Sequence, residues 1–222
     1  MRKKVLITGA SRGIGKSIKD AYEKSGCEVI CPTRQEMDLS SGKSIITYLE
    51  KLNTPIDILI NNAGVNFINN FNNLEFKELE ETFQINTLSP YIISKYFIEN
   101  FFIPQKSGSI INIGSLWIIK TREGRASYSM SKAALEAMTK SIAIEFGSMN
   151  IICNMISPGF IGTDLTYKNN SDTEINSIIE KVPLKRLGQS EEIADLALFL
   201  GLNNKYITGQ NIYIDGGISK NF

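Results

Sequence analysis

The chain contains no histidine, the residue that most often carries protons near neutral pH. It has only three cysteines, Cys27, Cys31 and Cys153, and their spacing matches neither a CxxC pair nor a disulfide framework. With so few sulfur ligands and no imidazole, a zinc site is not expected, and we predict no bound metal.

The chain also lacks an excess charge of either sign. Its formal net charge is +1, so we expect no strong field that would attract nucleic acid or a membrane surface. Long apolar runs are missing too. The run from Val5 to Ile7 is too short for the core of a signal peptide, and none approaches transmembrane length. We therefore expect a cytoplasmic protein without nucleic-acid or membrane partners.

What is present is an alternation of strand and helix patterns along all 222 residues. Short apolar runs predict strands at 4–8, 28–31, 56–64 (running into a loop), 108–115, 151–159 and 209–217. Helical spacing predicts helices at 13–26, 41–53, 74–102, 128–147 and 190–201. We expect the long helix to break or kink at Pro90, and the polar stretch 160–182 to be an irregular lid. The alternation predicts one α/β domain over residues 1–222, a Rossmann-type, doubly wound parallel sheet.

A glycine cluster, TGASRGIG at 8–15, follows the first strand and opens the first helix. Such a cluster alone often marks only a tight turn. In this strand–turn–helix context, glycines let the backbone approach a phosphate, and the helix N-terminus favours its charge.

The spacing TGxxxGxG resembles the short-chain dehydrogenase/reductase family. The resemblance covers essentially the whole chain, through NNAG (61–64), GS (114–115), YSMSK (128–132), SPGFIGTD (157–164) and ITGQNIYIDGG (207–217). Its C-terminal part looks most like bacterial 3-oxoacyl-[acyl-carrier-protein] reductases. The resemblance implies an oxidoreductase that moves a hydride between a nicotinamide and a carbonyl or secondary alcohol.

Tyr128 and Lys132 are four residues apart and share one face of a predicted helix. Such a pair is commonly just a solvated helix face. A nearby cation can also lower the pKa of a phenol, as a site without histidine requires. The resemblance implies that Tyr128 is the general acid/base and that Lys132 tunes it and binds the nicotinamide ribose. It also implies that Ser115 steadies the substrate carbonyl and that Asn86 holds a proton-relay water.

The resemblance also implies a set of cofactor-binding residues: Gly9, Ser11, Arg12, Gly13, Ile14, Gly15, Arg34, Asp38, Leu39, Asn62, Ala63, Gly64, Tyr128, Lys132, Pro158, Gly159, Ile161 and Thr163. Arg12 and Arg34 could clamp a 2′-phosphate, which favours NADP(H) over NAD(H). Both could instead be surface arginines, or Glu36 could bond the ribose of NAD. The chain passes from Arg34 to Asp38 in four residues, so the region after the second strand is shortened relative to the family.

Three functions compete for this site. The first is an NADP(H)-dependent ketoreductase of 3-oxoacyl thioesters, the second the same chemistry on a sugar, polyol or secondary metabolite, and the third a non-catalytic NADP-binding sensor. Trp117 and Ile118 are expected in the pocket wall, and Tyr167, Lys168 and Asn169 give the lid a polar start. Arg122 and Arg125 could meet an anion, although solvated arginines are the more common case.

The family resemblance further implies a homo-oligomer, a tetramer or dimer, that pairs the segments 74–102, 132–147 and 190–217 with their copies. Apolar residues in two of these segments suggest an interface: Phe97, Phe101, Phe102, Ile142, Ile144 and Phe146. Phe222, in the C-terminal tail, is expected to lie against a neighbouring subunit.

Overall fold

A six-stranded parallel sheet organises the chain in the computed structural model, which describes residues 2–52 and 54–220. The strands lie in the order β2 (Glu28–Ile30), β1 (Lys4–Ile7), β3 (Ile58–Asn61), β4 (Gly108–Ile113), β5 (Ile151–Pro158) and β6 (Asn211–Ile214). All five pairings are parallel, which confirms the predicted doubly wound sheet. The last strand is shorter than predicted. Because β2 and β3 flank β1 on opposite sides, the topological switch point lies between β1 and β3.

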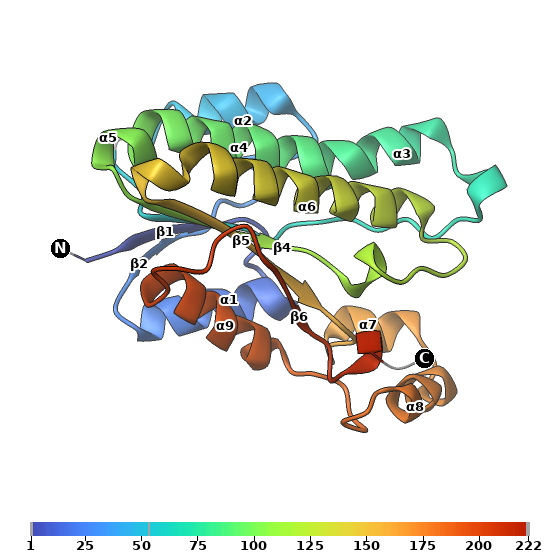
Figure 1. The fold of residues 1–222 in the computed structure, drawn as a ribbon. Helices are drawn as coiled ribbons and strands as arrows, with labels where there is room; N and C mark the ends of the chain where they lie inside the picture. The colour runs from blue at the N-terminus through green and yellow to red at the C-terminus, as the bar shows by residue number, and fades with distance from the viewer. Residues whose placement is uncertain (1, 53, 221–222) are drawn as a thin grey trace.

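Helices cover both faces of the sheet (Figure 1). One layer holds α2 (Gly42–Leu49), α3 (Phe76–Phe83), α4 (Ser89–Phe97) and α6 (Ala126–Phe146), and the other holds α1 (Gly13–Lys24) and α9 (Ser190–Leu202). Side chains alternate between the two faces along each strand, so one strand contributes residues to the hydrophobic core on both sides of the sheet. Val5 and Ile7 pack with Tyr22 of α1, whereas Leu6 packs with Phe97 of α4.

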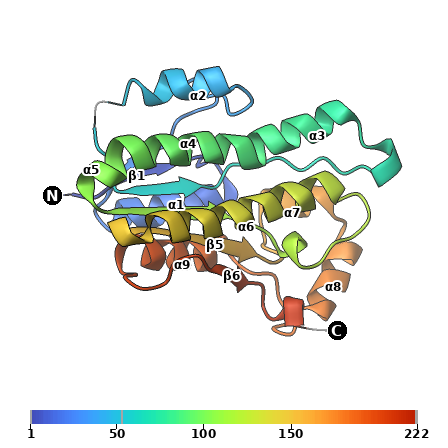
Figure 2. The ribbon, with the colours of Figure 1, turned by 45° about the horizontal axis from the view of Figure 1, so that its top comes forward.

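The helical segment predicted at 74–102 is interrupted before Pro90. A π-helical turn at Gln84–Leu88 joins α3 to α4, and Pro90 lies at the start of α4. Since proline has no N–H to donate, the backbone widens on its N-terminal side. A second π-helical turn, Ile98–Phe102, leads into the short α5 (Ile103–Gln105). The helices still follow one line across the sheet (Figure 2).

The prediction of an irregular segment at 160–182 is wrong. The chain forms α7 (Asp164–Asn169) and α8 (Asp172–Lys181) there, beyond the carboxyl end of β5 (Figure 1). The Thr163 hydroxyl accepts from the backbone N–H of Thr166 and caps α7. Ser171 and Glu174 form a reciprocal capping box at α8. These caps outweigh the polar composition on which the prediction relied.

The shortened region after β2 contains neither a strand nor a helix within the described residues 31–41. It turns back through hydrogen bonds from the backbone N–H groups of Glu36 and Met37 to the Thr33 carbonyl. This agrees with the four-residue spacing in the sequence.

The apolar residues assigned to an interface are mostly core residues. Phe97, Phe101, Phe102 and Ile142 are buried in the cluster above the sheet and Phe146 packs against it, whereas Ile144 is 86% exposed. The sheet thus accounts for most of this apolar surface. Phe222 lies outside the described residues. None of the described helices is long and apolar enough to cross a membrane.

Candidate active site

The glycine loop connects β1 to α1 and is held tightly against its neighbours. Gly9 and Gly13 have φ angles of 69° and 53°, in the left-handed region that favours glycine. A Cβ atom on Gly15 would lie 2.2 Å from the Gly9 carbonyl oxygen. The loop therefore needs glycine at these positions, and it leads directly into the N-terminus of α1, where an anion is favoured.

Two adjoining cavities open along the carboxyl ends of the strands and share Gly64 and Val65. The first, about 480 Å³, is lined by predicted cofactor residues Gly9, Ser11, Arg34, Asp38, Leu39, Ala63 and Gly64. The second, about 560 Å³, is lined by Arg12, Ile14, Asn62, Gly64, Tyr128, Lys132, Pro158, Gly159, Ile161 and Thr163. Gly13 and Gly15 line neither cavity and shape the loop instead. Because the two cavities meet at Gly64 and Val65, the pair is suited to an extended dinucleotide.

The first cavity has the features expected around an adenine ribose. The Glu36 carboxylate lies outside the lining of this cavity; its Oε2 atom accepts hydrogen bonds from the backbone N–H and hydroxyl of Thr33, which lower its pKa. Arg34 is about 80% exposed and lies 3.8 Å from the Asp38 carboxylate. Lys19, which the sequence analysis missed, lines the same cavity. Arg12 lines the other cavity, so the two arginines of the predicted clamp do not share one.

Ser115, Tyr128 and Lys132 come together on the wall of the second cavity. Ser115 lies two residues after the end of β4, and its hydroxyl accepts from the Trp117 N–H. Tyr128 and Lys132 lie on α6, one turn apart. The Lys132 ammonium is buried, donates to the Ile113 carbonyl at 2.7 Å, and lies 5.8 Å from the centroid of the Tyr128 ring. Three of the four predicted catalytic residues therefore line the same cavity.

The electrostatics of this trio differ from the sequence-based expectation. Burial raises the pKa of Tyr128, and the Ser115 hydroxyl and the charge of Arg125 oppose this shift. Burial lowers the pKa of Lys132 to about 8. The net pKa shift of Tyr128 is therefore upward, and Arg125 joins Lys132, 5.8 Å from the ring centroid, as a cation beside this phenol.

Asn86 lies in the π-helical turn and lines neither cavity. Its side-chain amide donates to the Val65 carbonyl and its oxygen accepts from the Val65 N–H, both at 2.9 Å. The same amide donates to the Ser131 hydroxyl at 3.0 Å. Asn86 therefore fixes the shared wall of the two cavities to the helix that holds Tyr128.

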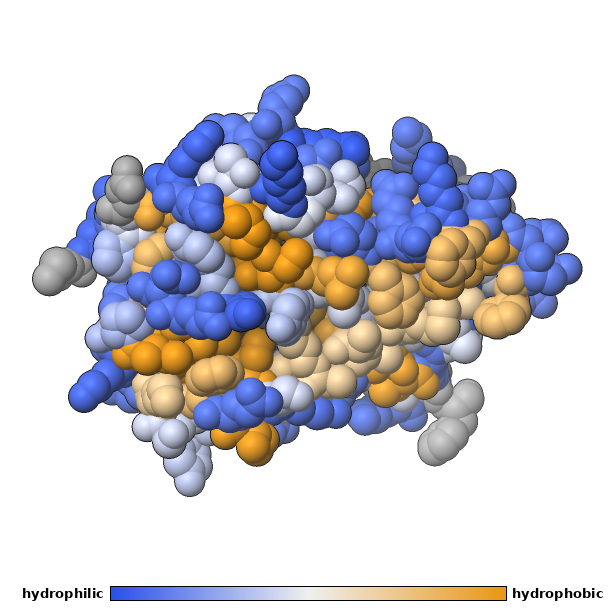
Figure 3. Space-filling view, turned by 90° about the horizontal axis from the view of Figure 1, so that it is seen from above, coloured by the Kyte–Doolittle hydropathy of each residue, from blue (hydrophilic) through white to orange (hydrophobic). Residues whose placement is uncertain are grey.

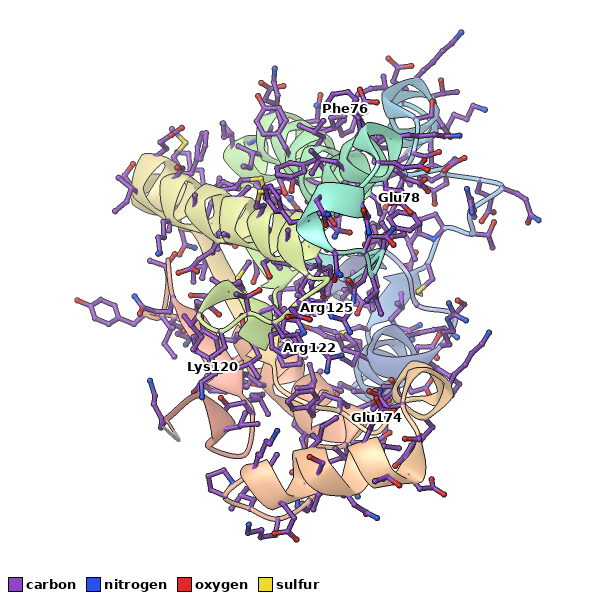
Figure 4. All side chains as sticks on the ribbon, turned by 90° about the vertical axis from the view of Figure 1, so that its right-hand side faces the viewer. Phe76, Glu78, Lys120, Arg122, Arg125 and Glu174 are labelled. Atoms are coloured by element: carbon purple, nitrogen blue, oxygen red, sulfur yellow. The ribbon has the colours of Figure 1, made fainter. Side chains whose placement is uncertain are left out.

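The far side of the second cavity is aromatic and cationic. Trp117 packs edge-to-face on Phe160 at 5.7 Å, and the Arg122 guanidinium lies 5.6 Å from the Trp117 ring centroid. Ile118 does not line this cavity. Arg122 is exposed, as expected of a solvated arginine, but Arg125 is buried, so that expectation is wrong for Arg125. Figure 4 shows both arginines at the strand ends, between α6 and the α7–α8 segment.

The predicted lid supplies Thr166 and Asn170 to the cavity lining. Tyr167 and Lys168 are exposed and are not part of that lining. The polar character expected of the lid is therefore present in Thr166 and Asn170, and the side chain of Asn169 lies outside the described part of the structure.

Comparison with known proteins agrees with this architecture. A family profile described as enoyl-(acyl carrier protein) reductase matches residues 36–219. The chain is 34% identical to a 3-oxoacyl-[acyl-carrier-protein] reductase of Buchnera aphidicola, over 98% of this chain and 97% of that protein. It is 32% identical to an L-xylulose reductase of Caenorhabditis elegans, over 99% and 96% of the two chains. A solved 4-hydroxyisoleucine dehydrogenase complexed with NADH is 30% identical, with a TM-score of 0.93 over 100% of both chains.

The parallel sheet, the glycine loop and the two adjoining cavities at the strand ends define a nicotinamide-dependent oxidoreductase that acts on CH–OH groups. Within that class, the chain belongs to the short-chain dehydrogenase/reductase family.

Proposed function

We propose that the protein is an NADP(H)-dependent carbonyl reductase in which Tyr128 exchanges the proton. The observation that supports it most directly is that Ser115, Tyr128 and Lys132 line one cavity, which adjoins the cavity beside the glycine loop at Gly64 and Val65. NADPH, when bound, would supply the hydride for the carbonyl carbon. The Tyr128 hydroxyl gives its proton to the carbonyl oxygen, so that a secondary alcohol forms. Ser115 donates a hydrogen bond to that oxygen and holds it beside Tyr128.

NADP(H) is the proposed cofactor because two cations line the first cavity and its one acidic lining residue among those described, Asp38, is bonded to Ser40 and lies beside Arg34. Arg34 and Lys19 line it, and the Glu36 carboxylate is held by Thr33. An acidic side chain that selects NAD must be available to the ribose hydroxyl. Arg12, on the other cavity, suits the linking phosphates better than the 2′-phosphate.

Two substrate classes fit the reaction. Resemblance to 3-oxoacyl-[acyl-carrier-protein] reductases favours a 3-oxoacyl thioester. The arginines, Thr166 and Asn170 on the cavity wall favour the alternative, a polar metabolite such as a sugar or polyol, and one relative is an L-xylulose reductase. A non-catalytic sensor is disfavoured, because it would not require the serine and tyrosine hydroxyls to meet.

A screen of NADPH oxidation against acetoacetyl thioesters, ketoses and small ketones tests the function. We expect turnover of at least one class, abolished by Tyr128→Phe. Tight NADPH binding without turnover of any carbonyl compound would favour the sensor instead.

We also propose a homo-oligomer that pairs α4 and α6 across a two-fold axis. Leu88 and Tyr91 on one helix segment and Met130 and Ile144 on the other are exposed apolar residues. Figure 3 shows the face formed by these helices, where apolar residues gather in bands between charged ones. An exposed band of this kind is typical of a protein interface.

A further inference from the structure

Arg125 is buried in the wall of the 560 Å³ cavity without a partner. The residue is 7% exposed, and its Nε atom is buried with no hydrogen-bond acceptor. No hydrogen bond or ion pair within residues 2–52 and 54–220 involves its guanidinium group. Burying a charge without a partner is costly, so such a group needs an explanation.

The position of Arg125 in α6 adds to this cost. It is the N-cap residue of a 21-residue helix whose first turn contains no acidic residue. The N-terminus of a helix is the positive end of its dipole and repels a cation. The charge of Arg122 adds to burial in lowering the pKa of Arg125. Helix, neighbour and burial all disfavour this guanidinium unless an anion is present.

The cavity itself provides no such anion. Four cationic residues line it, Arg12, Arg122, Arg125 and Lys132, and no aspartate or glutamate does so among the residues whose side chains are described. In a chain with a net charge of +1, this is a local concentration of positive charge. Glu174, labelled on the α8 side in Figure 4, feels the charge of Arg122, but its carboxylate is bonded to Ser171.

Arg125 is placed to reach a group close to the reacting carbonyl. It precedes Tyr128 by three residues, and residues three apart are neighbours on a helix face. Both line the same cavity. A guanidinium presents parallel N–H donors that match the two oxygens of a carboxylate.

We propose that the physiological substrate carries a carboxylate a few carbon atoms from its carbonyl and that Arg125 binds this carboxylate. Arg122, which lies over the Trp117 ring and is exposed, is a second and weaker contact. The inference rests on the proposed carbonyl reduction and narrows its substrate to small oxo acids. It sets aside neutral thioesters as the preferred class.

The test compares substrates that share a carbon chain and differ in charge. Acetoacetate is set against methyl acetoacetate and the acetoacetyl-N-acetylcysteamine thioester, and levulinate against methyl levulinate, with NADPH at constant ionic strength. The wild type should favour the acid in at least one set by about 10- to 100-fold in kcat/KM, the range for a charge-assisted bond. Arg125→Gln should remove that preference by slowing the acid alone, and Arg125→Lys should restore part of it.

Two controls accompany the comparison. Lys140→Gln removes a positive charge from the same helix outside the cavity, where Lys140 pairs with Glu136, and should leave the preference unchanged. The melting temperature of Arg125→Gln should equal or exceed that of the wild type, because the variant removes an unpaired buried charge. Equal rates for acid and ester in the wild type, or an equal loss of both in Arg125→Gln, would overturn the proposal.

A binding measurement separates this inference from the proposed reaction. Trp117 is the only tryptophan and lines the cavity, so its fluorescence in the NADP⁺ complex reports binding there. Malonate should change it in a saturable way, at least 10-fold more weakly in Arg125→Gln, and dimethyl malonate should not. If none of the carbonyl compounds is reduced but malonate binds the wild type more tightly than Arg125→Gln, the redox proposal fails and the anion site stands. Identical malonate titrations of both proteins would eliminate the anion site whatever the kinetics show.

Discussion

The Lys132 ammonium lies 5.8 Å from the centroid of the Tyr128 ring and donates to the Ile113 carbonyl at 2.7 Å. The contact joins α6, which holds the proposed proton donor, to the end of β4, which is followed by Ser115. The strand and the helix that form the catalytic wall are thus held together by a buried cation.

Replacing Tyr128 with phenylalanine should keep the fold and the cofactor affinity but lower kcat by about 10²–10⁴-fold, the usual contribution of general acid catalysis. The ring still fills its place, but the transferable proton is gone. Steady-state kinetics with a reducible carbonyl and NADPH titration by fluorescence measure the two effects. Tyr206→Phe, in an exposed loop, is the matched control. Near wild-type turnover in Tyr128→Phe would assign the proton elsewhere.

Replacing Lys132 with methionine should abolish turnover. It should also stabilise the protein at pH 7 by about 1–2 kcal/mol, because removing a buried charge outweighs the bond that the Ile113 carbonyl loses. The pKa of Lys132 falls from 10.5 to about 8 on folding, so between these values the unfolded chain binds more protons at this residue. Wild-type stability should therefore rise relative to the variant as pH increases from 8 to 10, and the advantage of the variant should shrink.

Urea unfolding of both proteins at pH 7, 8, 9 and 10 tests this difference. The three thiols, whose pKa values are also raised by burial, are present in both proteins and cancel in the comparison. The exposed Lys140→Met variant controls for loss of a lysine. A stability difference that does not change with pH would contradict the lowered pKa of Lys132.

Replacing Asn86 with alanine should destabilise the protein by about 2–4 kcal/mol, since the Val65 N–H and carbonyl both lose a buried partner. Because Val65 lies where the two cavities meet, the KM for NADPH should rise as well. Thermal unfolding and cofactor titration measure the two effects. Asn100→Ala, which removes one exposed bond to Tyr96, should change neither. A variant with wild-type stability would show that Asn86 does not brace this wall.

The wild type should prefer NADPH, and changing both Arg12 and Arg34 to alanine should collapse or reverse the preference. The cavity linings distinguish the two residues. Arg34→Ala alone should raise the KM for NADPH about 10-fold with little change for NADH, as expected on losing a charge-assisted bond. Arg12→Ala should weaken both cofactors alike. A wild-type enzyme that prefers NADH would point to Glu36 despite its bonds to Thr33.

Light scattering coupled to gel filtration should give a mass of a tetramer or dimer at micromolar concentration. The double variant Leu88→Glu and Ile144→Glu should shift it toward the monomer, because charges would be buried in the proposed interface. Lys95→Glu, a charge reversal on α4, indicates whether any added acidic residue has this effect. A monomeric wild type at all concentrations would exclude pairing through α4 and α6.

The sheet, the glycine loop and three members of the catalytic group could be predicted because each follows from local patterns. Apolar runs ending at small residues gave β1, β3 and β4, and helical spacing put Tyr128 and Lys132 on one face. The helices at 164–181 were missed because Thr163 and the Ser171–Glu174 pair act through capping, which composition does not show.

The burial of Arg125 could not be predicted, because it depends on how α6 packs over β4 and β5. Sequence alone favours a solvated arginine at that position, and only the tertiary arrangement places it inside the cavity. The opposing effect of the Arg125 charge on the raised pKa of Tyr128 has the same origin.

The early end of β2 has a consequence for association between molecules. β2 is three residues long and is the outermost strand on its side of the sheet, and the chain then leaves in turns. A long flat edge would offer a ladder of unpaired N–H and carbonyl groups to another chain, which is a route to aggregation. With only three residues at that edge, the shortened sheet gives little template for strand addition.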